Sequence, residues 1–272
     1  MVVGQLNKIL VLFLLIIFSN QNLNAVEFKG KFNQGSFILG KTSPGAKVKI
    51  DNKDVLVSKD GYFVFGIGRD RKNDLTIRII KDQKLEIITK KVFKRKYKIQ
   101  RIDGLPEKKV TPPKEVYERI KRENKIIADA RAIESDLTFF TKKFINPLDK
   151  AIVTGVYGSQ RILNGKPKWP HYGIDFAAKE GTKIKAMLDG TATMVEPDLF
   201  YTGGTLIFDH GHGISTLYMH MKDIYVKNGQ KVKQGEIIGT VGSTGRSTGP
   251  HLDVRLNWFG VRLDPATVLN LN

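Results

Sequence analysis

The sequence predicts a mostly β protein in which two β-rich parts are joined by a helical connector. Short apolar segments, separated by Gly, Pro and Asp at intervals of about 8 to 12 residues, recur in both halves and are typical of antiparallel sheets. Only one stretch, from about residue 111 to 140, has the apolar spacing of a helix. With 272 residues, of which 41% are hydrophobic, the chain is long enough to bury a substantial core.

Cysteine content and charge narrow the possible functions. The chain has no cysteine, which excludes disulfide scaffolds, thiolate zinc sites and cysteine nucleophiles. Its formal charge of +18 favours anionic partners, namely nucleic acid, acidic lipid or an anionic cell-wall polymer. Residues 26–112 hold 22 basic and 10 acidic side chains, whereas residues 151–272 hold 13 and 10 together with all five histidines. This distribution predicts a strongly basic N-terminal part and a C-terminal part that carries the side chains suited to catalysis or metal binding.

Residues 1–25 are interpreted as a secretory signal peptide. Lys8 is followed by an unbroken apolar run from Ile9 to Phe18, which is too short to span a bilayer but fits the apolar core of a signal. Ala25 is the small residue at the predicted cleavage point, although Leu23 is larger than cleavage sites prefer, so an uncleaved anchor is the alternative. We therefore expect an exported protein of the periplasm or cell envelope.

Residues 26–104 are predicted to form a small, basic, antiparallel β-sandwich. Val48 and Ile50 alternate with Lys47, Lys49 and Asp51, which is the period-2 pattern of a half-buried strand. Further β-rich runs follow at turn-bounded intervals. The pattern resembles bacterial immunoglobulin-like accessory domains.

The stretch from Lys90 to Arg101 (KKVFKRKYKIQR) is unusually basic, with Phe93 and Tyr97 interleaved. It is interpreted either as an edge strand that lysine keeps soluble or as a binding surface for an anionic wall polymer or membrane. Nucleic acid would suit the same pattern but is excluded as a partner by the expected export.

Residues 105–145 are predicted to be an amphipathic helical connector. Thr111 before Pro112-Pro113 is typical of a helix start, with Thr111 as N-cap, and Pro147 lies beyond the predicted end. The apolar positions at helical spacing are Val116, Ile120, Ile127, Ala130, Leu137 and Phe140. The segment is interpreted as a structural strut, with a partner-binding helix as the alternative.

Residues 146–272 are predicted to form an antiparallel β-rich domain that carries candidate metal ligands. His171 and Asp175 would lie about 13 Å apart on a straight strand, which is too far to share an ion, so they converge only if the chain bends at Tyr172-Gly173. His251 and Asp253 lie on one face of a strand because side chains alternate, about 7 Å apart. The sequence therefore predicts a metal site whose assembly depends on this bend.

Three motifs carry a resemblance to a known family. HYGID (171–175), LYMH (217–220) and GSTGRSTGPHLD (242–253) are similar to the three signatures of the lysostaphin-type zinc metallopeptidases, which cleave peptide cross-links of peptidoglycan. YGSQR (157–161) and VKNGQKVKQGEIIGTVG (226–242) match the intervening sequence, so the resemblance covers about residues 144–270. It implies a metal-activated water and one divalent ion, zinc above all, bound by His171 and Asp175. It also implies that His220 and His251 act as general base and transition-state stabiliser.

The third ligand position departs from the family pattern. Where the resemblance implies a second histidine, this chain has Asp253, and carboxylate oxygen is a normal zinc ligand. Two aspartates and one histidine would neutralise the ion and weaken its Lewis acidity. The site is thus expected to bind zinc less tightly, to prefer a harder metal such as manganese, or to be inactive. Arg255 shares the face of Asp253 and is an alternative partner for that carboxylate.

The other candidate residues are given structural roles. His210 and His212 form an H-x-H pair but are expected to be structural or rim residues. Arg161 is expected to hold a loop, and Tyr201 and Tyr218 are expected to pack rather than to catalyse. No substrate-binding residue is identified.

Three classes of function compete. The first is an exported metallo-endopeptidase that hydrolyses peptidoglycan cross-links. The second is a catalytically impaired relative that binds the cell wall or activates other wall hydrolases. The third, a swinging-arm carrier, is disfavoured because position 188, in Met187-Leu188-Asp189, is leucine rather than the lysine that such carriers need.

Overall fold

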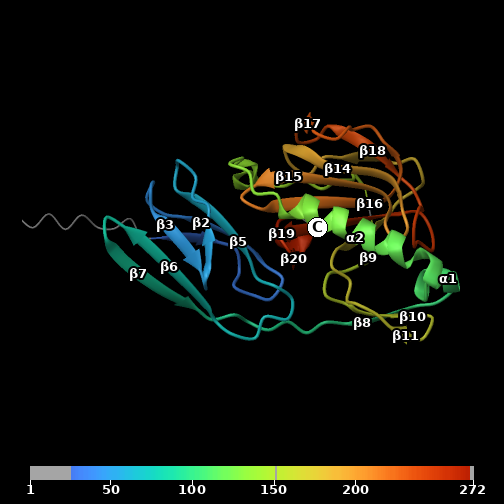
Figure 1. The fold of residues 1–272 in the computed structure, drawn as a ribbon, viewed down its shortest axis with the longest axis horizontal. Coiled ribbons are helices and arrows are strands. Elements are labelled where there is room, and N and C mark those ends of the chain that lie inside the picture. Colours follow the sequence, from blue (N-terminus) through green and yellow to red (C-terminus); the bar gives the residue numbers. More distant parts are fainter. Residues whose placement is uncertain (1–25, 151, 270–272) are drawn as a thin grey trace, which may run out of the picture.

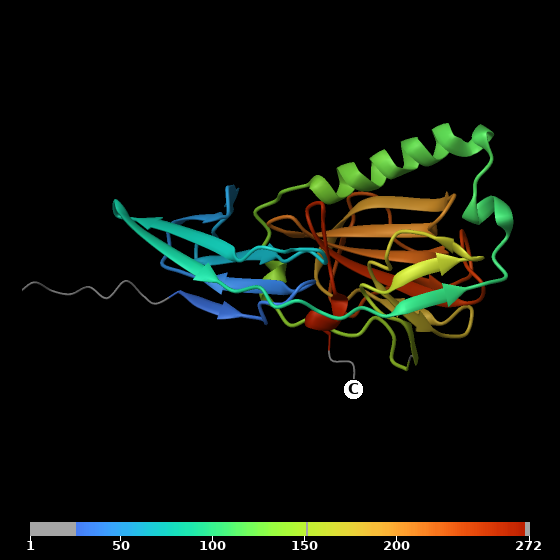
Figure 2. The ribbon, with the colours of Figure 1, turned by 90° about the horizontal axis from the view of Figure 1, so that it is seen from below.

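The structure is a computed structural model that describes residues 26–150 and 152–269. The predicted signal peptide, residues 1–25, lies outside the described residues. Strands make up 44% of the structure and helices 12%, which confirms the predicted fold class. The two β-rich parts lie side by side, and the long helix α2 runs along the C-terminal part (Figures 1 and 2). Within the described ranges, no helix is both long and apolar enough to cross a membrane.

The N-terminal part consists of a three-stranded and a four-stranded antiparallel sheet, in the orders β1-β2-β5 and β4-β3-β6-β7. Leu75, Ile77 and Ile79 of one strand are buried at every second position, which gives the four-stranded sheet its inner face. The strands are β1 (Glu27–Lys29), β2 (Phe37–Lys41), β3 (Lys47–Ile50), β4 (Lys53–Val55), β5 (Tyr62–Gly66), β6 (Leu75–Lys81) and β7 (Lys84–Lys90).

The basic stretch after Lys90 is mainly a connecting segment rather than an edge strand of these sheets. It ends in β8 (Ile99–Ile102), which pairs in parallel with β10 (Gln160–Leu163) of the C-terminal part. Arg95 donates to Asp264 at 2.7 Å, and the Arg69 guanidinium stacks on the Tyr97 ring at 4.3 Å. These contacts tie the segment to its neighbours, which is why it does not continue the sheet of β7.

The connector differs from its prediction at both ends. Thr111 is not an N-cap: its N–H donates to the Glu107 carbonyl and closes the short helix α1 (Glu107–Val110). The long helix α2 (Tyr117–Ala132) starts after the 3-10 turn Lys114–Val116. It also ends earlier than its apolar spacing indicates, so that Leu137 and Phe140 lie beyond it, Phe140 in the 3-10 turn Phe139–Thr141.

Tertiary contacts explain the early end of α2. Ser135 donates its hydroxyl to the Asp209 carboxylate at 2.5 Å and its carbonyl accepts from the His212 N–H at 2.9 Å. These bonds hold the chain after Ile133 extended along a strand. Ala130 of α2 packs with Met194, Leu199, Ile207 and Leu217 of the C-terminal sheet.

The C-terminal part is a ten-stranded sheet with the path β17-β14-β15-β16-β19-β12-β9, to which β13, β18 and β20 attach. A small separate sheet, β11-β10-β8, lies beside it. The remaining elements are β9 (Ile152–Gly155), β11 (Lys166–Pro167), β12 (Ile174–Ala177), β13 (Lys183–Lys185), β14 (Gly190–Leu199), β15 (Gly203–Gly211), β16 (Ile214–Ile224), β17 (Lys231–Val232), β18 (Ile237–Val241), β19 (His251–Trp258), β20 (Val261–Leu263) and the 3-10 turn Pro265–Thr267.

One continuous hydrophobic core joins the two β-rich parts. Phe37 of β2 packs edge-on against Phe144 with the ring centroids 6.0 Å apart. A Cβ on Gly66 of β5 would lie 2.5 Å from a methyl group of Leu263, so glycine at this position lets β5 approach β20 closely. The two parts therefore share one core instead of forming two separate ones.

The buried His210 should make stability depend on pH. Its Nδ1 lies 2.7 Å from the Asp189 carbonyl and its Nε2 lies 2.8 Å from the Thr216 hydroxyl, and burial lowers the pKa of the ring from 6.5 to about 4. The unfolded chain binds this proton near pH 6.5, so stability is present above that pH and is lost as the pH falls towards 4, by on the order of 3 kcal/mol. Thermal unfolding across pH 7 to 4 should show this fall, and His210→Asn should have a shallower pH slope. Equal slopes would contradict the assignment.

Candidate metal centre

Two strands and one loop bring the candidate ligands together. In the antiparallel pair of β12 and β19, Asp175 lies opposite Asp253, and β16 flanks β19 on its other side. His171 precedes β12 in a loop, held by its N–H to the Ser159 carbonyl and by its carbonyl to the Gly158 N–H. The chain bends between this loop and the strand, as the separation of His171 and Asp175 requires.

Gly173 makes this bend sterically possible. A Cβ at this position would lie 2.4 Å from Asp253 Oδ1 and 2.5 Å from the Val254 carbonyl oxygen. Any side chain would therefore push β12 away from β19 and separate the two carboxylates.

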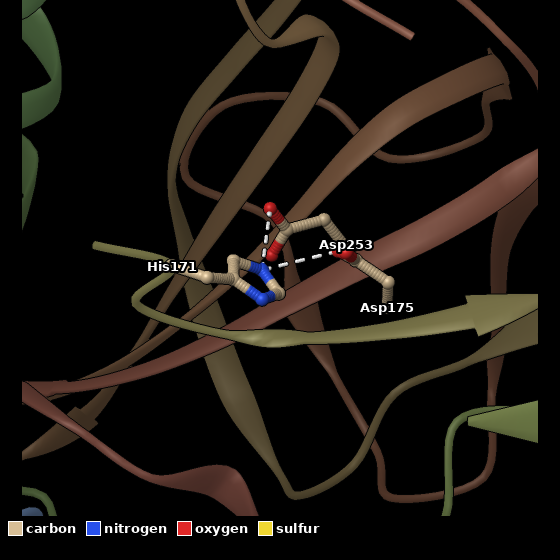
Figure 3. A group of neighbouring side chains, drawn as sticks. All are labelled: His171, Asp175 and Asp253. Carbon is tan, nitrogen blue, oxygen red and sulfur yellow. Dashed lines mark ion pairs between the residues drawn. The ribbon is translucent and has the colours of Figure 1, made fainter. Parts of the chain in front are cut away.

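The donor atoms of His171, Asp175 and Asp253 converge on one point (Figure 3). His171 Nε2 lies 3.1 Å from Asp175 Oδ1 and 3.4 Å from Asp253 Oδ2, and the three ligand atoms all lie within 4.8 Å of one another. Ligands about 2.0–2.1 Å from a tetrahedral metal are separated by about 3.3–3.4 Å, so the two short distances match such a site.

Burial and unsatisfied hydrogen bonding also fit a cation. All three side chains are buried, and among the described residues His171 Nε2 and Asp175 Oδ1 make ion-pair contacts but no hydrogen bond of regular geometry. Buried polar atoms are normally hydrogen-bonded. Two buried polar atoms that lack hydrogen bonds and face a common point are therefore explained by a ligand bound between them. The donor set of one imidazole and two carboxylates suits zinc and, because of its oxygen atoms, manganese.

Two arginines partly balance the carboxylates. Arg161 Nη2 donates to Asp175 Oδ2 at 2.9 Å, and Arg255 donates from Nη2 to Asp253 Oδ2 at 3.0 Å and from Nε to Oδ1 at 3.3 Å. Burial disfavours ionisation of Asp253, but attraction to Arg255 and then to His171 outweighs it and holds the pKa of Asp253 well below its usual value. The alternative partner predicted for Asp253 is thus present in the structure.

His220 and His251 lie beside this cluster, their rings 4.6 Å apart. Because a carbonyl only accepts, the Nδ1–H of His220 donates to Thr244 O at 2.8 Å, and that of His251 donates to Gly249 O at 2.8 Å. In the neutral rings Nε2 is then unprotonated. Burial, and then repulsion from His251, lower the pKa of His220 to about 4, so this ring is neutral at physiological pH.

The backbone at His220 also has an unusual conformation. Its φ of 61° lies in the left-handed region, which costs energy for a residue other than glycine. The His220 N–H donates to the Thr202 carbonyl at 2.8 Å, and this bond helps to hold the strained residue in place.

The remaining predicted residues lie outside the cluster or support it. Both ring nitrogens of His210 are within hydrogen-bonding distance of structural partners, and His212 packs on the Phe140 ring at 4.7 Å. The Tyr218 hydroxyl accepts from the Met187 N–H at 2.8 Å within the core. Arg161, expected to hold a loop, contacts Asp175 directly instead.

A groove of about 330 Å³ leads to the cluster. Asp175, His220 and His251 line it, together with loop residues 246–250. Its other wall comes from β8 and β10, which contribute Gln100 and Leu163. From the sequence, Arg161 of this wall is expected only to hold a loop, and no residue of β8 or β10 is predicted to line a groove, because the two strands come from distant parts of the chain. Arg246 has only its place within the third motif as a signal.

Comparisons with known proteins agree with the predicted resemblance. Residues 169–265 match the model described as Peptidase family M23, which confirms the resemblance to lysostaphin-type peptidases for the C-terminal region. The chain is 42% identical over 98 residues to the DD-carboxypeptidase/endopeptidase Mpg of Neisseria meningitidis, covering 36% of this chain and 22% of that protein. It is 37% identical over 125 residues to the peptidoglycan DD-endopeptidase ShyC of Vibrio cholerae, covering 45% of this chain and 28% of that protein.

A solved structure extends the likeness beyond the matched region. A crystal structure from Pseudomonas aeruginosa, whose name assigns it to peptidase M23, has a TM-score of 0.67 and 26% identity, and the match covers 88% of this chain and 94% of that one. The chain spans only about a quarter of the length of the two curated relatives named above.

Proposed function

We propose that the protein is a metallo-endopeptidase that hydrolyses peptide cross-links of peptidoglycan, because residues 169–265 match the model of peptidase family M23. The observation that carries this proposal is the convergence of three buried donor atoms within 4.8 Å of one another beside a groove. Two of these atoms make no hydrogen bond of regular geometry to any residue that the structure describes. Relatives named as peptidoglycan DD-endopeptidases support the substrate class.

In the proposed reaction His171, Asp175 and Asp253 hold one divalent ion. When bound, such an ion polarises the scissile carbonyl and lowers the pKa of a water molecule. His220 lines the groove and its Nε2 is unprotonated, so it would accept a proton from the water molecule that attacks the carbonyl and pass a proton to the leaving amine. His251, oriented by the Gly249 carbonyl, stabilises the charge that develops on the substrate oxygen.

The choice of metal follows from the donor set. Two carboxylates neutralise a divalent ion, and the Arg161 and Arg255 guanidiniums withdraw electron density from both of them. Zinc is the proposed ion and manganese is the alternative, because hard oxygen donors favour it. Metal analysis of the purified full chain, before and after chelation, separates the two.

The Arg255–Asp253 ion pair favours a second candidate function. Arg255 balances the charge of the Asp253 carboxylate, so that this residue needs no metal ion as a partner. Such an arrangement is expected of an impaired relative that binds the wall or activates other hydrolases. The full chain incubated with purified peptidoglycan and either zinc or manganese tests both functions by mass spectrometry of the released peptides. Cleavage that a chelator stops supports the enzyme, and intact cross-links with both metals reject it.

The proposed place of action is the cell envelope, where this substrate lies. The basic N-terminal part is proposed to bind anionic wall polymer or a membrane surface and so to concentrate the protein there. Four lysines of the connecting segment are exposed and have no acidic partner within ion-pair distance among the described residues: Lys91, Lys94, Lys96 and Lys98. Exposed charges are screened over about 10 Å at 0.1 M salt, so this attraction should weaken as salt rises.

Replacing these four lysines with glutamine in the full chain should reduce retention on purified wall material about tenfold at low salt and little at high salt. Four exposed lysines of the C-terminal part, Lys183, Lys227, Lys231 and Lys233, provide the matched control with the same change in net charge. Co-sedimentation at 20 and 300 mM salt measures retention. An equal loss in both variants would assign the effect to net charge rather than to the connecting segment.

A further inference from the structure

A second cavity, of about 670 Å³, lies between α2 and the C-terminal sheet, next to the candidate metal centre. One face of α2 lines it with Ile120, Asn124, Ile127 and Arg131, which recur at helical spacing. His220 and Asp253 line its inner end, so this cavity and the first groove meet at the candidate metal centre. In Figure 2, α2 runs above the strands of this sheet.

The lining of this cavity is strongly cationic. Asp253 is the only acidic side chain among the described lining residues, and it is already paired with Arg255. Six basic side chains line the same space: Arg131, Arg161, Lys168, Arg246, Arg255 and Arg262.

Several of these cations have unused hydrogen-bonding capacity. Arg131 donates from Nε to the Ile127 carbonyl at 3.2 Å, but its Nη1 is buried without a hydrogen-bond partner among the described residues, and Arg161 Nε is in the same state. Burial and repulsion from Arg255 lower the pKa of Arg131 to about 10, which leaves it charged at neutral pH. Buried, mutually repelling guanidiniums with free donors are stabilised by an anion.

The metal would increase this positive charge. In the structure, Asp175 is paired with Arg161 and Asp253 is paired with Arg255. A divalent ion shared by the two carboxylates would neutralise them and leave both guanidiniums uncompensated. A ligand that enters from the cavity towards the metal centre is therefore expected to carry negative charge.

We propose that this cavity is a subsite for a free carboxylate of the wall peptide, located next to the scissile bond, with Arg131 as a binding residue. The inference rests on the proposed function, because it identifies the substrate class of the same site. A planar carboxylate matches the two parallel donors of a guanidinium. The apolar walls formed by Ile120, Ile127 and Pro170 suit the aliphatic part of a short peptide rather than a free phosphate.

Binding to the chelator-treated full chain tests this subsite without requiring catalysis. The probes are a synthetic pentapeptide that ends in D-Ala-D-Ala with a free carboxylate, the same peptide with a terminal carboxamide, and inorganic phosphate. A hydrogen bond to a charged group contributes about 1.5–3 kcal/mol, so calorimetry should give at least about tenfold tighter binding for the carboxylate peptide than for the carboxamide.

Arg131→Gln should reduce this preference to about twofold or less, since it keeps a polar side chain but removes the charge. Arg122→Gln, on the exposed side of the same helix, is the matched control and should keep the wild-type preference. Circular dichroism and thermal unfolding verify that both variants are folded.

The outcomes separate the subsite from the enzymatic function. Equal affinity for carboxylate and carboxamide, no binding of either, or a preference that persists in Arg131→Gln overturns the subsite. Phosphate that binds as tightly as the carboxylate peptide shows a general anion site and also overturns it. If the protein prefers the carboxylate peptide but cleaves no cross-link, the subsite is supported and the proposed function is rejected. If it cleaves cross-links without any such preference, the proposed function is supported and the subsite is rejected.

Discussion

Replacing Asp253 with alanine is expected to abolish tight metal retention and to lower cross-link cleavage by about a thousandfold or more. The change removes one of three proposed ligands, and a loss of about 4 kcal/mol in transition-state stabilisation corresponds to a factor of about 10³. Metal content by elemental analysis and peptide release by mass spectrometry measure the two effects. Unchanged metal content would show that Asp253 is not a ligand.

Loss of fold must be separated from loss of the ligand in this variant. Asp253→Ala leaves the Arg255 guanidinium unpaired in the interior, which costs about 3–5 kcal/mol. The double variant Asp253→Ala/Arg255→Met removes both charges and should recover much of this stability while it remains metal-free and inactive. A double variant that retains metal would reject the proposed ligand set.

Two further substitutions distinguish a working site from a decayed one. Arg255→Met releases Asp253 from its ion pair, so metal retention should persist or increase if the carboxylate is a ligand. Asp253→His inserts a larger ring where Gly173 already approaches closely, so activity should fall or stay level in a working site. In a decayed site the wild type would be inactive, and Asp253→His would be the variant that creates activity.

Replacing His220 with asparagine should lower kcat by about 10²–10⁴-fold while the metal content stays at the wild-type level. The size of the effect is that of a lost general base, and asparagine tolerates the left-handed backbone that this position requires. Rates on a defined cross-linked peptide, together with elemental analysis, separate catalysis from metal binding.

His212→Asn is the matched control for this substitution. His212 has the same left-handed backbone, with φ of 50°, but its ring packs on Phe140 away from the metal centre. Activity of the folded variant should therefore stay within about twofold of wild type, because the buried His212 ring contacts Phe140 and not the metal centre. An equal loss in both variants would assign the effect at His220 to folding.

Several features could be predicted from the sequence because they depend on residues close together in the chain. The bend at Gly173 follows from the spacing of His171 and Asp175, and the shared face of His251 and Asp253 follows from strand alternation. The predicted fold class is confirmed, since strand periodicity and turn residues are local signals.

The predicted connector shows where such local signals are insufficient. The apolar spacing of Leu137 and Phe140 indicates a helix that continues beyond Ala132, but Ser135 hydrogen-bonds to Asp209 and His212 and holds the chain extended. Tertiary hydrogen bonds therefore outweigh helical periodicity there. The basic segment behaves similarly, because β8 finds its partner in β10, about 60 residues further along the chain.

The sequence by itself determined the β-rich class, the candidate ligands and the two histidines beside them. Each of these depends only on residue types and on the spacing of residues that are close together in the chain. The tertiary structure alone decided what surrounds those residues. It pairs Asp175 with Arg161, and it closes α2 over a cationic cavity that contains Arg131. The physical reason is that electrostatic environment depends on distance in space, and segments far apart in sequence meet there only after the sheet and the helix have packed.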